Sequence, residues 1–210
     1  NTSGRDLKPK LKIEIFADII CPWCYIGKKR LENALSERPE IDFAIEWKGF
    51  LLNPSIPQYG IDRRRYLLTK FGHAASSVYS RIEQAGKLAG IDFNFDAIQR
   101  TPDSRSVHEL IIAAESNGYG LSEMFYQAYF LNGKDISSAD IQQEILESSN
   151  LSEISELQKI TEAKKILASD LAQANQFGID GVPFFVFNNQ ISLAGAHPEH
   201  ILLTAIDTTI

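Results

Sequence analysis

The distribution of strand patterns constrains the fold of this 210-residue chain most, because such patterns occur near both ends and nowhere between them. Near the N-terminus, residues 11–15 and 41–48 alternate apolar and polar side chains, which is the period of a strand with one polar face. Strand patterns return at residues 184–187 and 191–193, around a short polar turn. Residues 54–177 carry no convincing strand pattern. We therefore predict a β-containing domain that is interrupted by a long insertion.

Most of the remaining segments carry apolar residues at helical spacing and are predicted to form helices. The first such segment runs from Trp23 or Cys24 to about Arg38 and is closed by Pro39. It completes a strand–helix–strand unit, whose crossover should be right-handed. A last helix should include Pro198 in its first turn. Within the insertion, helical patterns occur at residues 63–71, 78–89, 107–117, 121–131, 139–148 and 163–177.

These patterns predict an α/β fold in which a large all-helical insertion separates an N-terminal βαβ half from a C-terminal ββα half. In residue terms, 11–53 and 178–210 form one domain, and 54–177 form the helical insertion domain. With 44% hydrophobic residues, the chain can bury a core of the necessary size.

Hydropathy and charge exclude two classes of partner. The longest apolar run, around Pro183 to Phe187, is far shorter than the roughly 20 residues that cross a bilayer. The net charge of −6 leaves no basic stripe for nucleic acid, and the tightest basic cluster is Arg63, Arg64 and Arg65. We expect these three arginines on the solvated side of a helix. Neither a membrane nor a nucleic acid is therefore an expected partner.

Cysteine usage bears on the compartment. Both cysteines lie in one four-residue motif, Cys-Pro-Trp-Cys at residues 21–24, so that no second pair is left for a structural disulfide. This favours a reducing compartment, and we expect a cytoplasmic protein. The first ten residues are polar and lack the apolar core of a signal peptide. A periplasmic location is the alternative if a signal peptide preceded them and was removed.

The cysteine motif stands at the predicted junction between the first strand and the first helix, which suits thiol chemistry. Backbone N–H groups and the dipole at a helix N-terminus stabilise a thiolate at Cys21, and Cys24 follows one turn later, within reach of a disulfide. We predict that Cys21 lies in an exposed loop and attacks, and that Cys24 is shielded and resolves the mixed disulfide. Pro22 suits the first helical turn, because it has no N–H to leave unpaired. Trp23 is either an exposed contact for substrate or a partly buried aromatic.

Two other interpretations of the cysteine pair are open. A zinc site would need two further ligands, and the histidines of the chain, His73, His108, His197 and His200, lack the paired spacing of a finger or ribbon. The cysteines could also be inert core residues, although a proline and a tryptophan between them at a strand-to-helix turn disfavour this. We predict a redox pair and no metal site.

A second motif, Gly-Val-Pro-Phe at residues 181–184, lies far from the first in sequence. A proline that opens a strand cannot donate to the ladder, and its place after an extended residue is the usual setting of a cis peptide. An ordinary strand-initiating proline is the alternative. Facing the cysteine pair, a cis proline leaves the backbone N–H and C=O of Val182 free to pair with an extended peptide. We therefore predict that Val182 and Pro183, with Pro22 and Trp23, bind substrate.

Four blocks of sequence resemble the DsbA family of thioredoxin-fold proteins, and within it most of all the FrnE-like branch. The blocks are DIICPWCYIG at 18–27, YFLNGKDIS at 129–137, GVPFFVF at 181–187 and AGAHP at 194–198. The first block is quite specific, and the order of all four is more specific than any one. The resemblance implies a thioredoxin-like fold interrupted by a helical domain, an active pair formed by Cys21 and Cys24, and a cis Pro183 preceded by Val182.

The resemblance also points to His108, because the family tends to have a histidine after the start of an insertion helix. We regard His108 as a candidate auxiliary residue, although a lone histidine at a helix start is more often a packing or capping residue than a proton shuttle. One departure concerns residues 194–197, Ala-Gly-Ala-His, where the family commonly shows Ser-Gly-Ala-Gln. This departure leaves the substrate preference open.

The predicted function is thiol–disulfide exchange with protein, peptide or small thiol substrates. Oxidation, reduction and isomerisation all stay open, as does the oligomeric state. No bound cofactor is expected, and glutathione is a candidate co-substrate. The enzymatic alternative is a glutathione-dependent isomerase of the 2-hydroxychromene-2-carboxylate type or a kappa-class transferase, in which a serine commonly replaces the first cysteine; Cys24 argues against it. The non-enzymatic alternative is a peptide-binding or holdase-like module.

Overall fold

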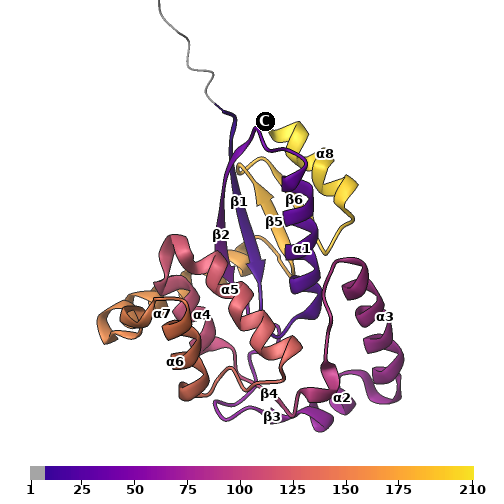
Figure 1. The fold of residues 1–210 in the computed structure, drawn as a ribbon, viewed down its shortest axis with the longest axis vertical. Coiled ribbons are helices and arrows are strands. Elements are labelled where there is room, and N and C mark those ends of the chain that lie inside the picture. The colour runs from indigo at the N-terminus through magenta and orange to yellow at the C-terminus, as the bar shows by residue number, and fades with distance from the viewer. Residues whose placement is uncertain (1–7) are drawn as a thin grey trace, which may run out of the picture.

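The computed structural model describes residues 8–210, and its centre is a mixed four-stranded sheet (Figure 1). Strand β1 (Lys10–Ala17) runs parallel to β2 (Asp42–Gly49) and antiparallel to β5 (Phe184–Phe187), which pairs with β6 (Ile191–Ala194). The strand order is β2-β1-β5-β6, so strands from the two ends of the chain lie side by side. The predicted α/β fold with split strands is therefore confirmed.

Two helices from the outer parts of the chain pack on one face of this sheet. Helix α1 (Pro22–Ser36) connects β1 to β2, and α8 (Glu199–Thr209) follows β6 and packs against α1 (Figure 1). Their apolar side chains, such as Ile26 and Leu202, share one buried core with Ile13 of β1. The elements β1, α1 and β2 form the predicted βαβ half, and β5, β6 and α8 form the predicted ββα half.

The opposite face of β1 is also covered, so the expectation of one polar face was wrong for this strand. Glu14 is 7% exposed and lies 3.5 Å from the Nζ of Lys48, and Phe16 is fully buried. The end of helix α7 (Leu157–Gln176) packs here, where Ala174 joins Phe16 in a second apolar cluster. Burial on both faces is typical of a central strand between layers of helices.

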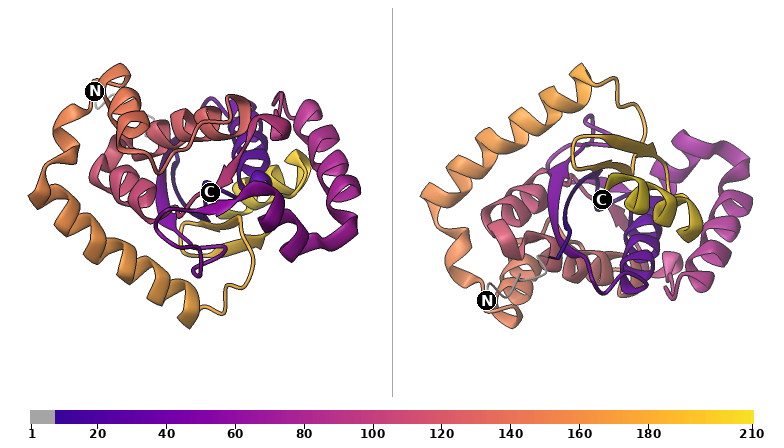
Figure 2. Two further views of the ribbon diagram at one scale, coloured as in Figure 1. Left: turned by 90° about the horizontal axis from the view of Figure 1, so that it is seen from below. Right: turned by 90° about the horizontal axis from the view of Figure 1, so that it is seen from above.

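Helices of the insertion surround the carboxyl end and the flanks of the sheet, and Figure 2 shows α3 and α7 on opposite sides of it. Helix α4 ends earlier than predicted, because Glu115 adopts a positive φ of 53° and begins a short 3-10 turn. Within residues 8–210, no helix has the length and hydropathy that crossing a membrane requires. The helices before α7 are α2 (Arg63–Phe71), α3 (Ala75–Leu88), α4 (Arg105–Ala113), α5 (Gly118–Tyr126) and α6 (Ala139–Ser148).

A small antiparallel sheet interrupts the helices of the insertion, where no strand was expected. It pairs β3 (Ile61–Asp62) with β4 (Arg100–Thr101), at the bottom of Figure 1. Strands of two residues are too short to show an alternating pattern, which is why the sequence did not reveal them. Gly60 has a φ of +80°, and a Cβ there would lie 3.0 Å from the carbonyl oxygen of Thr101, so the glycine allows this close pairing.

An aromatic cluster joins α1 to the insertion. Tyr25 of α1 stacks on Tyr126 of α5, with 4.6 Å between the ring centroids, and Phe130 stacks against both rings. The hydroxyl of Tyr25 also donates to the Glu123 carboxylate. One continuous apolar core therefore spans residues from both halves of the sheet domain and from the insertion. The division into domains at residues 54 and 177 stays a prediction from the sequence.

Candidate active site

Cys21 occupies the N-cap position of helix α1, directly after the carboxyl end of β1. Its Sγ accepts a hydrogen bond from the backbone N–H of Cys24, with 3.3 Å between N and Sγ. Pro22 is the first residue of the helix and is buried, and it contributes no N–H that would need a partner. The sulfur of Cys21 is therefore held at the positive end of the helix, where a thiolate is stabilised.

Both sulfur-bearing residues are more enclosed than the sequence suggests. Cys21 is 4% exposed and Cys24 1% exposed, so the expectation of an exposed loop around Cys21 was wrong. Both are free thiols. Burial raises the pKa of the Cys24 thiol well above its ordinary value, and hydrogen bonding to Cys21 and the negative charges of Cys21 and Asp18 raise it further. Cys24 is therefore held in the thiol form.

The peptide bond between Val182 and Pro183 is cis, as predicted, and it lies against the first cysteine. The carbonyl oxygen of Val182 lies 3.8 Å from Cys21 Sγ, which is the distance of a weak S–H···O hydrogen bond. The N–H of Val182 makes no hydrogen bond to any of residues 8–210. A Cβ on Gly27 would lie 2.8 Å from Pro183 Cγ, so a glycine at position 27 lets helix α1 approach the proline. The two motifs, far apart in sequence, thus meet in space.

The loop at residues 194–197 supports the proline from the other side. Gly195, with a φ of +97°, donates its N–H to the carbonyl of Pro183 at 2.8 Å. Arg30 of helix α1 donates to the carbonyl of Ala196. Among the remaining predicted contacts, Trp23 is 38% exposed beside the cysteines and presents an aromatic surface.

His108 is fully buried and is connected to the cysteine motif through Asp18. The indole N–H of Trp47 donates to His108 Nδ1 at 3.1 Å, and His108 Nε2 lies 3.1 Å from Asp18 Oδ1. Because an indole nitrogen can only donate, Nδ1 of the histidine must accept, and the proton of the neutral ring lies on Nε2. His108 therefore donates to Asp18 and holds that carboxylate in place.

Asp18 is the site residue that sequence reasoning missed, along with Trp47 and Tyr126. Its carboxylate is fully buried, and Oδ2 accepts from the N–H of Leu52 at 2.8 Å. Its carbonyl oxygen accepts from the N–H of Cys21 at 3.3 Å and from the hydroxyl of Tyr126 at 3.2 Å. An acidic residue inside the apolar run before the cysteines was the available signal, because a buried carboxylate needs partners.

The histidines do not gather around the cysteines. His73 and His200 are exposed and His197 is half-buried. Within residues 8–210, no group of three or more histidine, cysteine or acidic side chains lies close enough to hold a metal ion.

Comparison with known proteins identifies similar chains. The uncharacterized protein YwbO of Bacillus subtilis (strain 168) is 26% identical over 141 residues, and the match covers 66% of each chain, slightly less than two thirds. A probable DsbA oxidoreductase from Streptomyces coelicolor has a TM-score of 0.80 at 22% identity, over 95% of this chain and 89% of that one. The cytosolic disulfide reductase DsbM from Pseudomonas aeruginosa, solved with GSH, has a TM-score of 0.65 at 16% identity, over 94% of this chain and 98% of that one.

At these identities the structural likenesses show the fold, which is the thioredoxin-like fold that the four sequence blocks imply. The model of the family described as DSBA-like thioredoxin domain matches residues 12–207. That match includes both cysteines, the cis proline and the whole insertion. Placement in the FrnE-like branch stays a prediction. The chain belongs to the family of DSBA-like thioredoxin domains.

Proposed function

We propose that this protein exchanges disulfides with thiol or disulfide substrates, with Cys21 as the attacking and Cys24 as the resolving sulfur. The observation that supports this most is the position of Cys21 Sγ, 3.3 Å from the backbone nitrogen of Cys24 and 3.8 Å from the carbonyl oxygen of Val182. The helix start favours a thiolate at Cys21. Burial raises the pKa of the Cys24 thiol and keeps Cys24 protonated.

In the reducing direction, the Cys21 thiolate attacks one sulfur of a substrate disulfide and releases the other sulfur as a thiolate. Cys24 then loses its proton and attacks Cys21 Sγ, which releases the second substrate thiolate and leaves an enzyme disulfide. Two thiols, for which we propose glutathione, restore the dithiol and are themselves oxidised to a disulfide. Oxidation of a substrate dithiol is the same sequence in reverse.

Asp18 accepts the proton of Cys24 in this proposal. The carboxylate is buried, and its negative charge acts on the Cys24 thiol. His108 positions the carboxylate by donating to Oδ1, so the histidine acts through Asp18 and does not touch the sulfurs. This gives His108 an auxiliary role as a positioning residue.

Substrate contacts follow from exposure. Trp23 offers an exposed ring beside the cysteines, and the unpaired N–H of Val182 can pair with an extended backbone. Pro183 is buried and fixes the orientation of Val182. Pro22 is also buried, so it shapes the first turn of the helix and does not offer a surface to the substrate.

The test is turnover of insulin or scrambled ribonuclease by single cysteine variants. We expect Cys21→Ser to lose activity by at least about a thousandfold, since serine cannot form the mixed disulfide. Cys24→Ser should accumulate a covalent adduct between Cys21 and substrate, seen by mass spectrometry. Full activity of Cys21→Ser would contradict the proposal. Glutathione conjugation that survives in Cys24→Ser would favour the transferase or isomerase class, and client protection by the double variant without turnover would favour a binding module.

A further inference from the structure

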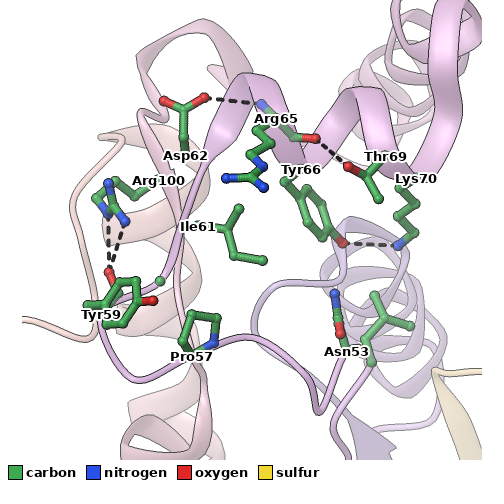
Figure 3. A pocket seen from close by; sticks show the side chains of 12 residues that line it. Asn53, Pro57, Tyr59, Ile61, Asp62, Arg65, Tyr66, Thr69, Lys70 and Arg100 are labelled. Atoms are coloured by element: carbon green, nitrogen blue, oxygen red, sulfur yellow. Dashed lines mark hydrogen bonds between the residues drawn. The ribbon is translucent and has the colours of Figure 1, made fainter.

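Four basic side chains gather at one corner of the molecule, which we call the basic corner (Arg63, Arg65, Lys70 and Arg100). Arg65, Lys70 and Arg100 line a cavity of about 730 Å³ between β3, α2 and the loop after β2. Figure 3 shows the guanidinium of Arg65 in the space between Ile61 and Tyr66. The chain as a whole is acidic, with 27 acidic and 21 basic residues, so this local excess of positive charge is unusual for it.

Arg63 adds a buried charge behind the cavity wall, and the expectation that it is solvated was wrong. It is 6% exposed, because it faces the rings of Tyr66 and Tyr79, with its Cζ 5.7 and 5.2 Å from their centroids. Its Nη1 donates to the hydroxyls of Thr101 and Tyr129, and its buried Nε has no hydrogen-bond partner within residues 8–210. A buried guanidinium without a carboxylate is costly.

None of the cations of the basic corner forms an ion pair within residues 8–210. Lys70 donates to the hydroxyl of Tyr66, and Arg100 donates to the carbonyl of Tyr59. The acidic residue of the cavity, Asp62, is turned away to cap helix α2, where it accepts from the backbone N–H of Arg65 (Figure 3). The positive charge of the corner is therefore not neutralised by the surrounding protein.

The cavity adjoins the cysteine site. Leu52 lines the cavity, and its backbone N–H donates to Asp18 at 2.8 Å. Tyr66 lies in the same wall: burial raises its pKa to about 12, Arg63 opposes that rise, and the negative charges of Asp18 and Cys21 add to it. The cavity wall is thus hydrogen-bonded to Asp18, which lies three residues before Cys21 in the sequence.

We propose that the basic corner binds acidic side chains that flank the reactive cysteine of an extended peptide substrate. The unpaired N–H of Val182 suits an extended backbone, and the open cavity, with the 78% exposed Tyr59 at its rim, accepts the neighbouring side chains. Carboxylates would supply the counter-charges that Arg65, Lys70 and Arg100 lack, and Arg65 can bind them in a bidentate manner. This inference rests on the proposed exchange activity and assigns its peptide substrates.

The experiment uses two peptides that differ only in charge. Each carries one cysteine as a mixed disulfide with neutral thiopyridine, flanked by glutamates in one peptide and by glutamines in the other. Attack by Cys21 of the reduced protein forms a bond to the peptide sulfur, breaks the disulfide and releases thiopyridone, which stopped-flow absorbance detects. We expect the glutamate peptide to react about tenfold faster at low salt, with a smaller difference at high salt.

Matched double variants locate the effect. Arg65→Glu with Lys70→Glu should remove or reverse the preference for the glutamate peptide, while the rate with the glutamine peptide stays within about twofold. Lys164→Glu with Lys165→Glu makes the same change in net charge on exposed positions of α7, on the opposite flank of the molecule from α2, and should keep the preference.

The possible results separate the two proposals. Equal rates for the two peptides, or a preference that persists in the Arg65 and Lys70 variant, would overturn the peptide inference and leave the exchange activity standing. The mixed disulfide of glutathione with thiopyridine serves as a third, small substrate. If this substrate reacts faster than the glutamine peptide while the glutamate peptide does not, the basic corner binds the carboxylates of a small molecule, and the peptide assignment is overturned. A wild-type protein that releases no thiopyridone from either peptide would overturn the exchange activity itself, and the inference with it.

Discussion

The buried network around Asp18 and the basic corner around Arg63 each contain a buried charged side chain, and they differ in how well its charge is matched by protein partners. In the network, both carboxylate oxygens of Asp18 accept a hydrogen bond, and both nitrogens of His108 have a partner. In the basic corner, Arg63 has an unpaired buried Nε, and none of the four cations forms an ion pair within residues 8–210. A satisfied network stabilises the folded structure, whereas the unmatched cations of the basic corner are the basis of the anion site proposed above.

The largest effect expected from this comparison is on stability at Asp18. Asp18→Ala leaves the His108 Nε2–H and the Leu52 N–H buried without an acceptor, so we expect a loss of about 3 kcal/mol in the free energy of unfolding. Urea denaturation followed by circular dichroism measures it. Asp62→Ala, which removes an exposed N-cap, is the control and should cost about 1 kcal/mol. Equal losses in the free energy of unfolding for both variants would show that the buried network around Asp18 is no more important for stability than an exposed helix cap.

Trp47→Phe tests the other end of the network. The change removes the donor to His108 Nδ1 and part of a buried ring, and we expect a loss of about 2 kcal/mol in the free energy of unfolding. The control is Trp23→Phe, because Trp23 is 38% exposed and should cost less than about 0.5 kcal/mol. If the two tryptophan variants were equally stable, the hydrogen bond from Trp47 to His108 would not contribute to the free energy of unfolding.

The reactivity of Cys24 tests whether the charge of Asp18 reaches the sulfur. In a Cys21→Ser background, burial still raises the pKa of Cys24, so its alkylation rate should increase about tenfold per pH unit up to about pH 10 without a plateau. Adding Asp18→Asn removes a negative charge, lowers the pKa of Cys24 and should speed alkylation severalfold at one pH. Iodoacetamide labelling followed by mass spectrometry measures both rates. A plateau that begins at about pH 9 would show an ordinary thiol.

The smallest effect on stability is expected for substitution of Arg63, whereas substitution of Asp18 should have the largest. Arg63→Met loses two hydrogen bonds but also removes an unmatched buried charge, so we expect the free energy of unfolding to change by less than about 1 kcal/mol. Arg64→Met, at an exposed position of the same helix, is the control. A loss of about 3 kcal/mol for Arg63→Met would mean that the arginine is a structural residue.

Much of the fold followed from local patterns. The bounds of α2 and α6, the hairpin strands and the cis peptide before Pro183 were predicted correctly, because periodicity and proline chemistry act over a few residues. The short pair β3 and β4 was missed, since its register depends on Gly60 meeting the backbone of Thr101, a contact between segments far apart in sequence.

The sequence predicted the cysteine pair of the site but not the buried residues that surround it. Nothing in the spacing of the arginines shows that Arg63 turns inward, because its burial depends on the rings of Tyr66 and Tyr79 from two different helices. In the same way, the partners of Asp18 come from the loop after β2 and from α4. Tertiary contacts of this kind determine which charged side chains are buried and which partners they have. The periodicity of apolar residues within one segment does not reveal them.

The contact between Cys21 and the carbonyl of Val182 joins residues 161 positions apart, which has a consequence for biosynthesis. A growing chain exposes both cysteines early, long before β5 and the proline loop have been made. Until the C-terminal strands join the sheet, the thiols are present without the surface that would align a substrate beside them. For the exchange proposed above, the site is therefore complete only after Val182 and Pro183 have been translated and the strands that follow them have joined the sheet.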